Sequence, residues 1–423
     1  MNRKMKRLRT VHFVGMGGSG MSGIAEVMIG LGYKIQGSDI RMSEQLERLK
    51  ALGAKVFLDH LPENIKKADA LVVSSAISSD NCEVSEAKKK MLPVVARAEM
   101  LAELMRFYYS IAVSGTHGKT TTTSLISTLL AEGGLDPTYI IGGCLKSSNS
   151  HAKLGLGEYL VAEADESDAS FTHLKPMISI LTNIDFDHMS TYEHDKNKLY
   201  SGFLSFLHNL PFYGLAIVCL DDPGVKEVMP KISRSVITYG TTDKADIYAK
   251  DIHFSESKTS FEVYRKNKNK KISVELNLPG IHNIQNALAA IAVATELNIE
   301  DRSIIEAFKN FSGINRRFQV TKNINVKDGE ITLIDDYGHH PTEILATINA
   351  IKSGWGSKRI TLLFQPHRYT RTKELFSEFV EVLSQVDQLI LTEIYAAGEE
   401  PIDNINGQSI IEDINNKSSK KSI

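Results

Sequence analysis

The sequence predicts an α/β protein made of three consecutive blocks, each built on a largely parallel sheet. Short apolar runs of the kind that form strands alternate with helical stretches along the chain, a pattern typical of parallel sheets. Polar or glycine-rich segments directly follow several of these runs, as expected at the carboxyl ends of parallel strands. The length of 423 residues exceeds what a single ordinary core supports. We therefore expect domains at residues 1–108, 109–311 and 312–423.

The first block begins with a short strand that runs directly into a cluster of glycines. Gly15, Gly17 and Gly20 give the spacing Gly-x-Gly-x-x-Gly, and Asp39 comes after the next strand, residues 33–37. This arrangement is a fingerprint of Rossmann-like domains, which bind a pyrophosphate or a ribose at this place. Taken alone, the motif suggests a dehydrogenase. The alternative is that the glycines only allow close packing between a strand and a helix.

The second block opens with a phosphate-binding loop, the segment 114–123 with the sequence SGTHGKTTTT. An apolar run, residues 108–113, precedes the loop, and a helical run, residues 124–131, follows it. Backbone N–H groups and the helix N-terminus of such a loop bind phosphate. Lys119 can reach the outer phosphates, and Thr120 can bind Mg²⁺ through its hydroxyl. The alternative is a glycine-rich turn with a solvated lysine.

Two acidic segments follow two further strands of the second block. The strand 159–164 leads into Glu163-Ala164-Asp165-Glu166-Ser167-Asp168, and the strand 177–181 leads into Thr182-Asn183-Ile184-Asp185-Phe186-Asp187-His188. An isolated acidic segment is usually a solvated loop. Two of them at strand ends, in a chain with a phosphate loop, favour an Mg²⁺ site, because Mg²⁺ prefers hard oxygen ligands and offsets phosphate charge.

The second half of this block contains an antiparallel region and a helix that begins with polar residues. Residues 254–278 read as alternating β-type runs, with the basic run 265–271 as a solvated hairpin tip. His282, Asn283 and Asn286 lie near the start of the helix that follows. Amide groups there can bind an adenine edge or can cap the helix, and the sequence leaves both readings open.

The third block repeats the pattern of polar residues after strands. The strand 331–335 leads into the sequence DYGHHPTE, and the strand 359–364 leads into QPHRYTR. Arg368 and Arg371 in the second of these suit a carboxylate or a phosphate, because guanidinium binds such groups in bidentate fashion. The alternative is a pair of surface arginines at the start of a helix.

Composition excludes several classes of protein. Apolar residues make up 42% and charged residues 24%, as in soluble globular proteins. A net charge of -2 gives no reason to expect a nucleic acid. Cys82, Cys144 and Cys219 are far apart and have no metal-ligand spacing, which favours a reducing, cytoplasmic setting. The basic first ten residues lead into glycines rather than an apolar core, so we expect no signal peptide. No apolar run approaches the ~18 residues of a membrane span, so we expect none.

Taken in order, the motifs resemble those of the muramyl ligase family of peptidoglycan synthesis. The resemblance covers about residues 8–411. The motifs that carry it are HFVGMGGSGMSGIAEVMIGLGYKIQGSD, VVSSAI, GTHGKTTT, EADESDASF, TNIDFDHMSTY, FLHNLPFYG, PGIHNIQNALAA, GINRRFQ, DDYGHHPTEI, FQPHRYTRT and YAAGEEPI.

The resemblance implies a function for each block. The first block would be a Rossmann-like domain for the UDP of a sugar nucleotide, the second a P-loop ATPase-like domain for ATP and Mg²⁺. The third would be a Rossmann-like domain that closes and brings the amino acid. The implied activity is an ATP-dependent ligase that joins L-alanine to the lactyl carboxylate of UDP-N-acetylmuramate through an acyl phosphate, giving ADP and phosphate. A cytoplasmic monomer or homodimer without nucleic-acid or membrane partners is implied.

The resemblance also implies roles for individual residues. The residues implied for UDP are Gly15, Gly17, Gly18, Gly20, Ser38 and Asp39. Those implied for the phosphates of ATP are Gly115, Thr116, His117, Gly118, Lys119, Thr120 and Thr121. Mg²⁺ would be held by Thr120, His188 and Glu163, which is favoured over Glu166 because it lies closer to its strand, with Asn183 beside the acyl phosphate. The adenine and ribose side would use His282, Asn283, Asn286, Arg317, Asp335 and Asp336, and alanine would be placed by His339, His367, Arg368 and Arg371.

Two departures from the family pattern lead to further expectations. Sister ligases carry a carbamylated lysine where this chain has Phe203, so no carbamate is expected. The family continues well beyond the YAAGEEPI motif, so the third domain is expected to be incomplete, with a disordered tail from about Asn415 and weakened activity.

Two alternatives stay open. One is a salvage ligase that attaches a ready-made peptide to UDP-N-acetylmuramate. The other is a nucleotide-binding protein without ligase activity.

Overall fold

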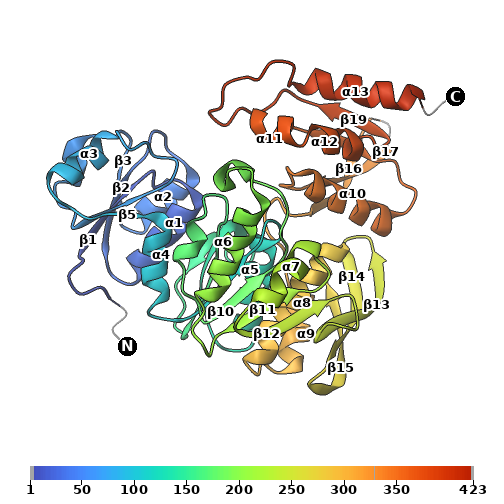
Figure 1. Cartoon of the computed structure of the whole chain (residues 1–423), viewed down its shortest axis with the longest axis horizontal. Helices are drawn as coiled ribbons and strands as arrows, with labels where there is room; N and C mark the ends of the chain where they lie inside the picture. The colour runs from blue at the N-terminus through green and yellow to red at the C-terminus, as the bar shows by residue number, and fades with distance from the viewer. Residues whose placement is uncertain (1–3, 328, 421–423) are drawn as a thin grey trace. The chain divides into compact units, whose positions relative to one another are not determined.

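The computed structural model describes residues 4–327 and 329–420. The chain divides into two compact units (Figure 1). The first unit contains the residues up to 250 together with 262–274 and 285–315, and the second contains 251–261, 275–284 and the chain from 316.

The N-terminal part of the first unit is a doubly wound α/β domain. Its sheet has the order β3-β2-β1-β4-β5, and every neighbouring pair is parallel. The chain therefore reverses direction across the sheet at β1 and β4, where open α/β sheets bind ligands. Its elements are β1 (Thr10–Val14), α1 (Ser19–Gly30), β2 (Lys34–Ser38), α2 (Glu44–Ala51), β3 (Lys55–Phe57), η1 (Pro62–Ile65), β4 (Ala70–Val73), α3 (Cys82–Lys89), β5 (Val94–Ala96) and α4 (Arg97–Met105).

Helix α1 shows why this sequence forms a helix that packs on the sheet. Met21, Ile24, Ala25 and Met28 recur at intervals of three and four residues, and each is almost completely buried. This spacing puts the four side chains on one face of a helix. Burial of each larger side chain contributes roughly 1.5–3 kcal/mol. The buried apolar face of α1 therefore anchors the helix, and with it the glycines that precede the helix.

The rest of the first unit is built around most of a ten-stranded sheet with the order β15-β14-β13-β12-β11-β10-β6-β9-β7-β8. The parts of β13, β14, β15 and α8 that fall within residues 251–261 and 275–284 belong to the second unit. The strands from β12 to β7 pair in parallel, whereas β7 and β8 are antiparallel. Its elements are β6 (Tyr109–Ser114), α5 (Lys119–Glu132), β7 (Thr138–Leu145), β8 (Ser150–Lys153), β9 (Tyr159–Glu163), η2 (Ser170–His173), β10 (Ile178–Leu181), η3 (Met189–Tyr192), α6 (Lys196–His208), β11 (Leu215–Cys219), α7 (Pro223–Val228), η4 (Met229–Lys231), β12 (Ser235–Gly240), β13 (Ile247–Ser255), β14 (Lys258–Arg265), β15 (Lys268–Leu276), α8 (Ile281–Glu296) and α9 (Asp301–Lys309).

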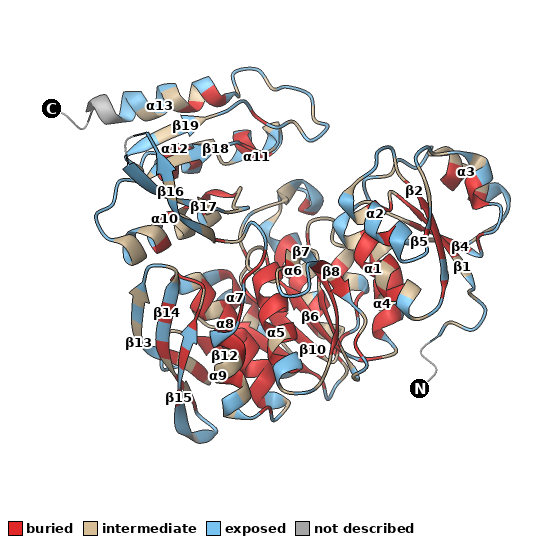
Figure 2. Ribbon diagram, turned by 180° about the vertical axis from the view of Figure 1, so that it is seen from behind, coloured by how far each residue is buried: buried red, intermediate tan, exposed pale blue. Residues whose placement is uncertain are grey.

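Buried residues line the middle of this sheet and the helices α5 and α8 (Figure 2). Strand β6 lies between β10 and β9 in the sheet. The segments that follow β10 and β9 therefore flank the segment that follows β6, because the carboxyl ends of parallel strands lie at the same edge. The sequence placed its phosphate loop and its two acidic segments after these three strands.

The predicted solvated hairpin tip at 265–271 is wrong for its first residue. The side chain of Arg265 is fully buried and makes a bidentate ion pair with Asp301, at 2.7 Å from Nη1 to Oδ1 and 2.9 Å from Nη2 to Oδ2. Asp301 is the first residue of α9, so β14 is tied to a helix N-terminus. Lys266, Lys268 and Lys270 are exposed, as expected.

The second unit includes two small sheets and four helices of the C-terminal block. Strands β16 and β17 form an antiparallel pair, and β18 and β19 form a parallel pair. Helices α10, α12 and α13 pack on the second pair around Ile344, Phe364, Phe379 and Ile410. The elements are β16 (Gln319–Val326), β17 (Gly329–Asp335), α10 (Pro341–Trp355), β18 (Thr361–Phe364), α11 (Tyr369–Glu374), α12 (Phe376–Leu383), β19 (Gln388–Leu391) and α13 (Gly407–Lys420).

The expected disordered tail from about Asn415 is wrong, because α13 continues through that position to Lys420. Ile410 on this helix is fully buried in the core of the unit, which gives the helix an anchor that its polar composition concealed. Among the described residues, no helix combines the length and the apolar character that crossing a membrane requires.

Candidate active site

The loop between β6 and α5 has the backbone of a phosphate cradle. Gly115 and Gly118 have φ angles of +134° and +82°, values that L side chains rarely adopt. A Cβ at Gly115 would lie 2.0 Å from Thr182 Oγ1, and one at Gly118 would lie 2.6 Å from Asn286 Oδ1. Glycine is therefore required at both positions, and the turn delivers the chain to the N-terminus of α5.

The segment after β10 braces this loop. Asn183 Oδ1 accepts a hydrogen bond from His117 N at 2.8 Å, and Asn183 Nδ2 donates to His117 O at 3.0 Å. Thr182 Oγ1 also donates to His117 O, at 2.6 Å, and the His117 ring lies 3.0 Å from Asp185 Oδ2. The predicted residues Asn183 and His117 thus lie together, with the Asn183 amide holding the loop backbone.

Lys119 lies inside the cradle rather than at its mouth. Its ammonium donates to Gly115 O at 2.7 Å, to Thr116 O at 3.0 Å and to Glu166 Oε2 at 2.6 Å. The Lys119 side chain is 16% exposed and the Glu166 side chain 3%. The alternative of a glycine-rich turn with a solvated lysine is therefore wrong, because the acidic segment after β9 supplies a buried counter-ion.

The charges of this pair follow from their surroundings. Burial raises the pKa of the Glu166 carboxyl to about 7, although the positive charge of Lys119 acts to lower that pKa. Burial alone would lower the pKa of Lys119, but the carboxylates of Glu166 and Asp165 outweigh it and raise that pKa. The ammonium therefore stays charged, which the stabilisation of a transferring phosphoryl group requires.

Two of the predicted metal ligands come to one corner of the site. Glu163 Oε1 accepts a hydrogen bond from Gly142 N at 2.6 Å, and a Cβ at the next residue, Gly143, would lie 2.7 Å from Thr120 Cγ2. Glu163 and Thr120 therefore share the neighbourhood of these two glycines on β7. The third predicted ligand, His188, lies in the segment after β10, where its Nε2 is 3.5 Å from Asp187 Oδ2.

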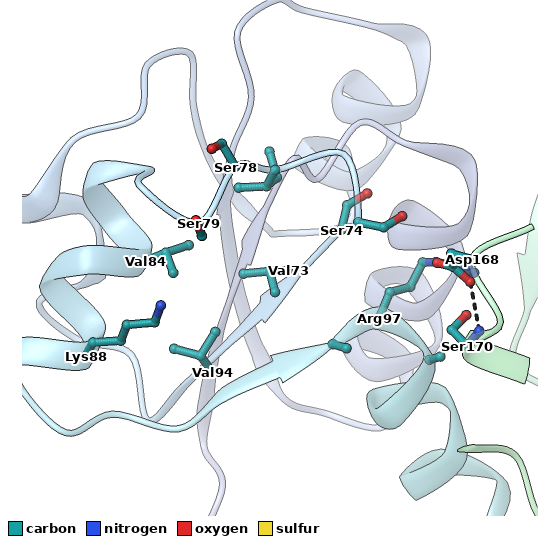
Figure 3. Close-up of a pocket in the computed structure, with 14 residues that line it drawn as sticks. Val73, Ser74, Ser78, Ser79, Val84, Lys88, Val94, Arg97, Asp168 and Ser170 are labelled. Carbon is teal, nitrogen blue, oxygen red and sulfur yellow. Dashed lines mark hydrogen bonds between the residues drawn. The ribbon is translucent and has the colours of Figure 1, made fainter. Parts of the chain in front are cut away.

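A pocket lies at the carboxyl ends of β4 and β5 (Figure 3). It has a volume of about 330 Å³ and is lined by Ser74, Ser78, Lys88, Arg97 and Asp168 among others. Arg97 extends toward the loop that carries Asp168, and its Nη2 lies 3.3 Å from Asp165 Oδ2. A Cβ at Gly20 would lie 3.0 Å from Arg97 Nη1, so the guanidinium packs directly on the N-terminal glycine loop.

The glycine loop itself is held by the end of β2. Gly17 N donates to Asp39 Oδ2 at 2.8 Å. Ser38, by contrast, has its hydroxyl turned into the interior, where it donates to Glu83 Oε2 at 2.5 Å. The side chain of Ser38 thus faces away from the surface on which the sequence placed a ligand.

The residues predicted for the adenine and ribose divide between the two units. Asn286 belongs to the first, where its Oδ1 accepts from Thr122 Oγ1 at 3.1 Å beside the phosphate loop. In the second unit, burial lowers the pKa of His282, with the charges of Asp336, Glu343 and Arg317 close by. The remaining predicted residues lie as follows: Asp336 accepts from Phe318 N and Gly338 N, Asp335 Oδ1 lies 3.9 Å from Arg316 Nε, Arg317 Nη1 lies 4.0 Å from Glu343 Oε1, and Asn283 donates to Pro279 O.

The residues predicted to place the amino acid come together in the second unit. The rings of His339 and His367 are 5.9 Å apart, and Arg371 Nη1 lies 3.2 Å from His367 Nδ1. Because guanidinium only donates, that nitrogen of His367 is an acceptor. Arg368, which has a φ angle of +71°, lies 4.0 Å from Glu399. Glu399 in turn accepts two hydrogen bonds from Thr370, so the YAAGEEPI segment holds the arginine loop.

The environment of His367 leads to a prediction about acid stability. Burial, aided by Arg371, lowers the pKa of His367 to about 4 from the usual 6.5. His367 has a higher pKa in the unfolded chain, so the unfolded chain takes up a proton at a higher pH than the folded chain does. The stability that the neutral His367 contributes is therefore fully present above about pH 6.5 and is lost as the pH falls toward 4. We expect His367→Gln to reduce the fall in melting temperature between pH 7 and pH 5 by roughly 2 °C or more. The matched control is the exposed residue His253, and an equal change in His253→Gln would contradict the assignment.

Three family models match successive parts of the chain. The model described as Mur ligase family, catalytic domain, matches residues 10–109, and the model described as Mur ligase middle domain matches residues 113–294. The model described as Mur ligase, glutamate ligase domain, matches residues 316–423. The chain belongs to the Mur ligase family. The predicted resemblance and the predicted three-domain α/β fold are thereby confirmed.

Solved structures of Mur ligases are similar along most of the chain. A UDP-N-acetylmuramate–alanine ligase from Thermotoga maritima is 28% identical with a TM-score of 0.80, covering 96% of this chain and 88% of that one. A UDP-N-acetylmuramate:L-alanyl-γ-D-glutamyl-meso-diaminopimelate ligase from Neisseria meningitides is 26% identical with a TM-score of 0.66, covering 73% and 100%. A murein peptide ligase from Psychrobacter arcticus is 23% identical with a TM-score of 0.73, covering 97% and 88%, which shows the fold alone.

Sequence reasoning missed several residues of this Mur ligase site. Arg97 and Ser74 line the pocket, Glu83 holds Ser38, and Glu399 holds the arginine loop. Ser74 and Glu399 lie in motifs that carried the family resemblance, VVSSAI and YAAGEEPI, so the signal was present without a role attached to it. Arg97 and Glu83 lie outside those motifs, and only the fold shows where they point.

Proposed function

We propose that this Mur ligase joins L-alanine to the lactyl carboxylate of UDP-N-acetylmuramate at the expense of ATP, releasing ADP and phosphate. The observation that carries the proposal is the position of the phosphate loop. It holds a buried, charged Lys119 and borders, through Arg97 and Asp165, the pocket at the end of the N-terminal sheet. A nucleotide-activating site next to a pocket for a second anionic ligand is what a ligase of this kind needs.

The residues of the cradle suit phosphoryl transfer. One carboxylate oxygen of the sugar substrate attacks the terminal phosphorus of ATP, the bond to ADP breaks, and an acyl phosphate forms. Lys119 would offset the charge that develops on the transferring group, and the N–H groups at the start of α5 would hold the phosphates. Thr120 and Glu163 offer the hard oxygen ligands that fit Mg²⁺. Bound there, Mg²⁺ would neutralise charge on the phosphate oxygens.

The second step joins the amino acid. The amine of alanine attacks the carbonyl carbon of the acyl phosphate, a tetrahedral intermediate forms, and phosphate leaves with its bonding electron pair. Arg371 and Arg368 would bind the alanine carboxylate, because guanidinium matches carboxylate geometry. His367 lies next to Arg371, and His339 lies next to His367, within the same unit. The neutral His367 adds no positive charge that would repel the ammonium form of alanine.

The N-terminal pocket would hold the UDP portion of the sugar substrate. The glycine loop and the start of α1 would bind the pyrophosphate, with Arg97 as its cationic partner. The similarity to a UDP-N-acetylmuramate–alanine ligase over 96% of this chain supports the choice of substrate. We also propose a cytoplasmic enzyme, monomeric or homodimeric, and the domain boundaries 1–108, 109–311 and 312–423.

A second candidate is a ligase that attaches a ready-made peptide to the same sugar nucleotide. The similarity to the tripeptide ligase from Neisseria meningitides, at 26% identity, favours it. The two activities differ only in the amine donor. Phosphate release from ATP should therefore be measured with UDP-N-acetylmuramate and a panel of amino acids and short peptides. We expect L-alanine to give the highest rate. Turnover with L-alanyl-γ-D-glutamyl-meso-diaminopimelate but not with alanine would establish the second candidate instead.

Ligand-induced stabilisation tests the sugar site independently of turnover. A ligand at 100 times its Kd stabilises the folded state by about 2.7 kcal/mol, because it binds only that state. We expect UDP-N-acetylmuramate to raise the melting temperature of the protein and NAD to leave it unchanged. A rise in melting temperature with NAD and none with the sugar nucleotide would instead indicate that the glycine motif belongs to a dehydrogenase.

A further inference from the structure

A buried polar cluster lies under the glycine loop of the N-terminal domain. We define it as His12, Gln36, Ser38, His60, Asn64 and Glu83. These residues come from β1, β2, the segment after β3, η1 and the first turn of α3, so the cluster joins five parts of the domain. Glu83 stands at its centre and is fully buried. Burying a carboxylate is costly unless each of its oxygens is satisfied.

Both oxygens of Glu83 are satisfied. Oε2 accepts from Ser38 Oγ at 2.5 Å and lies 3.2 Å from His60 Nδ1, and Oε1 accepts from Asn64 Nδ2 at 2.7 Å. His12 Nε2 lies 3.4 Å from Oε2. Burial by itself raises the pKa of Glu83, but the nearby His12 and the hydrogen bonds from Ser38 and Asn64 outweigh it and lower the pKa to about 2. The carboxylate is thus ionised at neutral pH.

The orientation of the other members is also determined. Gln36 Nε2 donates to Asn64 O at 2.7 Å, which fixes the amide, and the same nitrogen lies 3.2 Å from His12 Nδ1. Because the Gln36 nitrogen can only donate, His12 Nδ1 accepts, and the ring proton is on Nε2, facing Glu83. The donor and acceptor roles of Gln36, Asn64 and Ser38 are thus fixed, whereas His12 Nε2 faces Glu83 without the geometry of a hydrogen bond.

Ser38 connects this cluster to the glycine loop. Its hydroxyl is held by Glu83, whereas its carbonyl oxygen accepts from Gly15 N at 2.9 Å and from Met16 N at 3.1 Å. The following residue, Asp39, accepts from Gly17 N. Any movement of Ser38 would therefore be transmitted to the first three residues of the loop. Glu83 also lies in the first turn of α3, where the next residue, Val84, lines the pocket.

We infer that Glu83 is a positioning residue for the sugar-nucleotide site, acting through Ser38 on the glycine loop and through α3 on the pocket wall. The inference rests on the proposed function of that pocket. A group that only stabilised the core would affect all ligands alike. A group that shapes this loop should affect UDP and its sugar derivative while leaving ATP binding at the separate phosphate loop unchanged.

The test measures Kd values for UDP, UDP-N-acetylmuramate and ATP in the full-length chain. Glu83→Gln keeps the size of the side chain. Its amide N–H₂ must, however, face either the Ser38 hydroxyl or the Asn64 amide, both of which donate to Glu83 in the wild type. Ser38→Ala removes only the hydroxyl link and serves if Glu83→Gln folds poorly. The matched control is Glu86→Gln, which alters a partly exposed carboxylate on the same helix that pairs with Lys90.

We expect each of the two variants to weaken UDP and UDP-N-acetylmuramate binding by roughly ten-fold, with ATP affinity and the control unchanged. Because both variants remove the hydrogen bond between Ser38 and Glu83, their effects should overlap, and the double variant should lose less affinity than the product of the two single losses. Equal losses for ATP, or unchanged UDP affinity in a variant with a lowered melting temperature, would overturn the inference. Failure of the wild-type protein to bind UDP-N-acetylmuramate would instead reject the proposed function.

Discussion

Replacing Lys119 with methionine is expected to lower the ligase turnover number by about 10³-fold or more, because it removes the charge that faces the transferring phosphoryl group. Methionine keeps much of the volume and length of the side chain. The ammonium contacts the carbonyl oxygens of Gly115 and Thr116 as well as Glu166, so it also fixes the shape of the loop. The measurement is phosphate release from ATP at saturating UDP-N-acetylmuramate and alanine.

Loss of activity through misfolding needs a control, because Lys119→Met leaves Glu166 buried without its cation. That carboxyl already has a pKa of about 7, so it becomes protonated readily once the lysine charge is gone. The double variant Lys119→Met, Glu166→Gln removes the problem, since no ionisable group of the pair is left. It should melt close to the wild-type temperature and stay inactive. Turnover within about ten-fold of wild type in either variant would contradict the role of Lys119.

The sequence was informative where local patterns alone determine the structure. The glycine loop, the phosphate loop and the two acidic segments follow β1, β6, β9 and β10, as predicted. Parallel strands bring such segments to one edge of a sheet, so the neighbourhood of the phosphate loop could be inferred from strand order alone. The hydrogen bond between Gly17 and Asp39, by contrast, was not predicted, because the motif indicated only a ligand at this place.

What could not be predicted depends on contacts between residues far apart in the chain. Glu83 looks like any first-turn glutamate, and only the packing of α3 against β2 shows that it is buried on Ser38. Arg265 lies in a basic run that reads as solvated, until α9 brings Asp301 to it. Asn286 stays a prediction for the adenine side, and the contact of its amide with Gly118 and Thr122 likewise joins distant parts of the chain. For Glu83 and Arg265, one long-range partner decides the role of the side chain.

The choice between Glu163 and Glu166 as the Mg²⁺ ligand leads to the second large expected effect. Glu166 is 2% exposed and bound to the Lys119 ammonium, so a metal ion there would bring a second cation to one carboxylate. Glu163 is only partly buried, receives its hydrogen bond from a neutral backbone N–H, and shares its corner with Thr120. These contacts favour Glu163, as the sequence had predicted from its place next to the strand.

Glu163→Gln should therefore lower turnover by about 10²-fold or more at low Mg²⁺ concentration, because an amide is a weaker ligand for a hard cation than a carboxylate. Raising the Mg²⁺ concentration should recover part of the rate. Glu166→Gln should also lower turnover, because it disturbs Lys119, but its Mg²⁺ dependence should match that of the wild type. The measurement is the rate of phosphate release against Mg²⁺ concentration for the three proteins. A shifted Mg²⁺ requirement in Glu166→Gln and an unshifted one in Glu163→Gln would show instead that Glu166 is the Mg²⁺ ligand. The buried Glu166 carboxylate would then have to leave Lys119 when the metal binds.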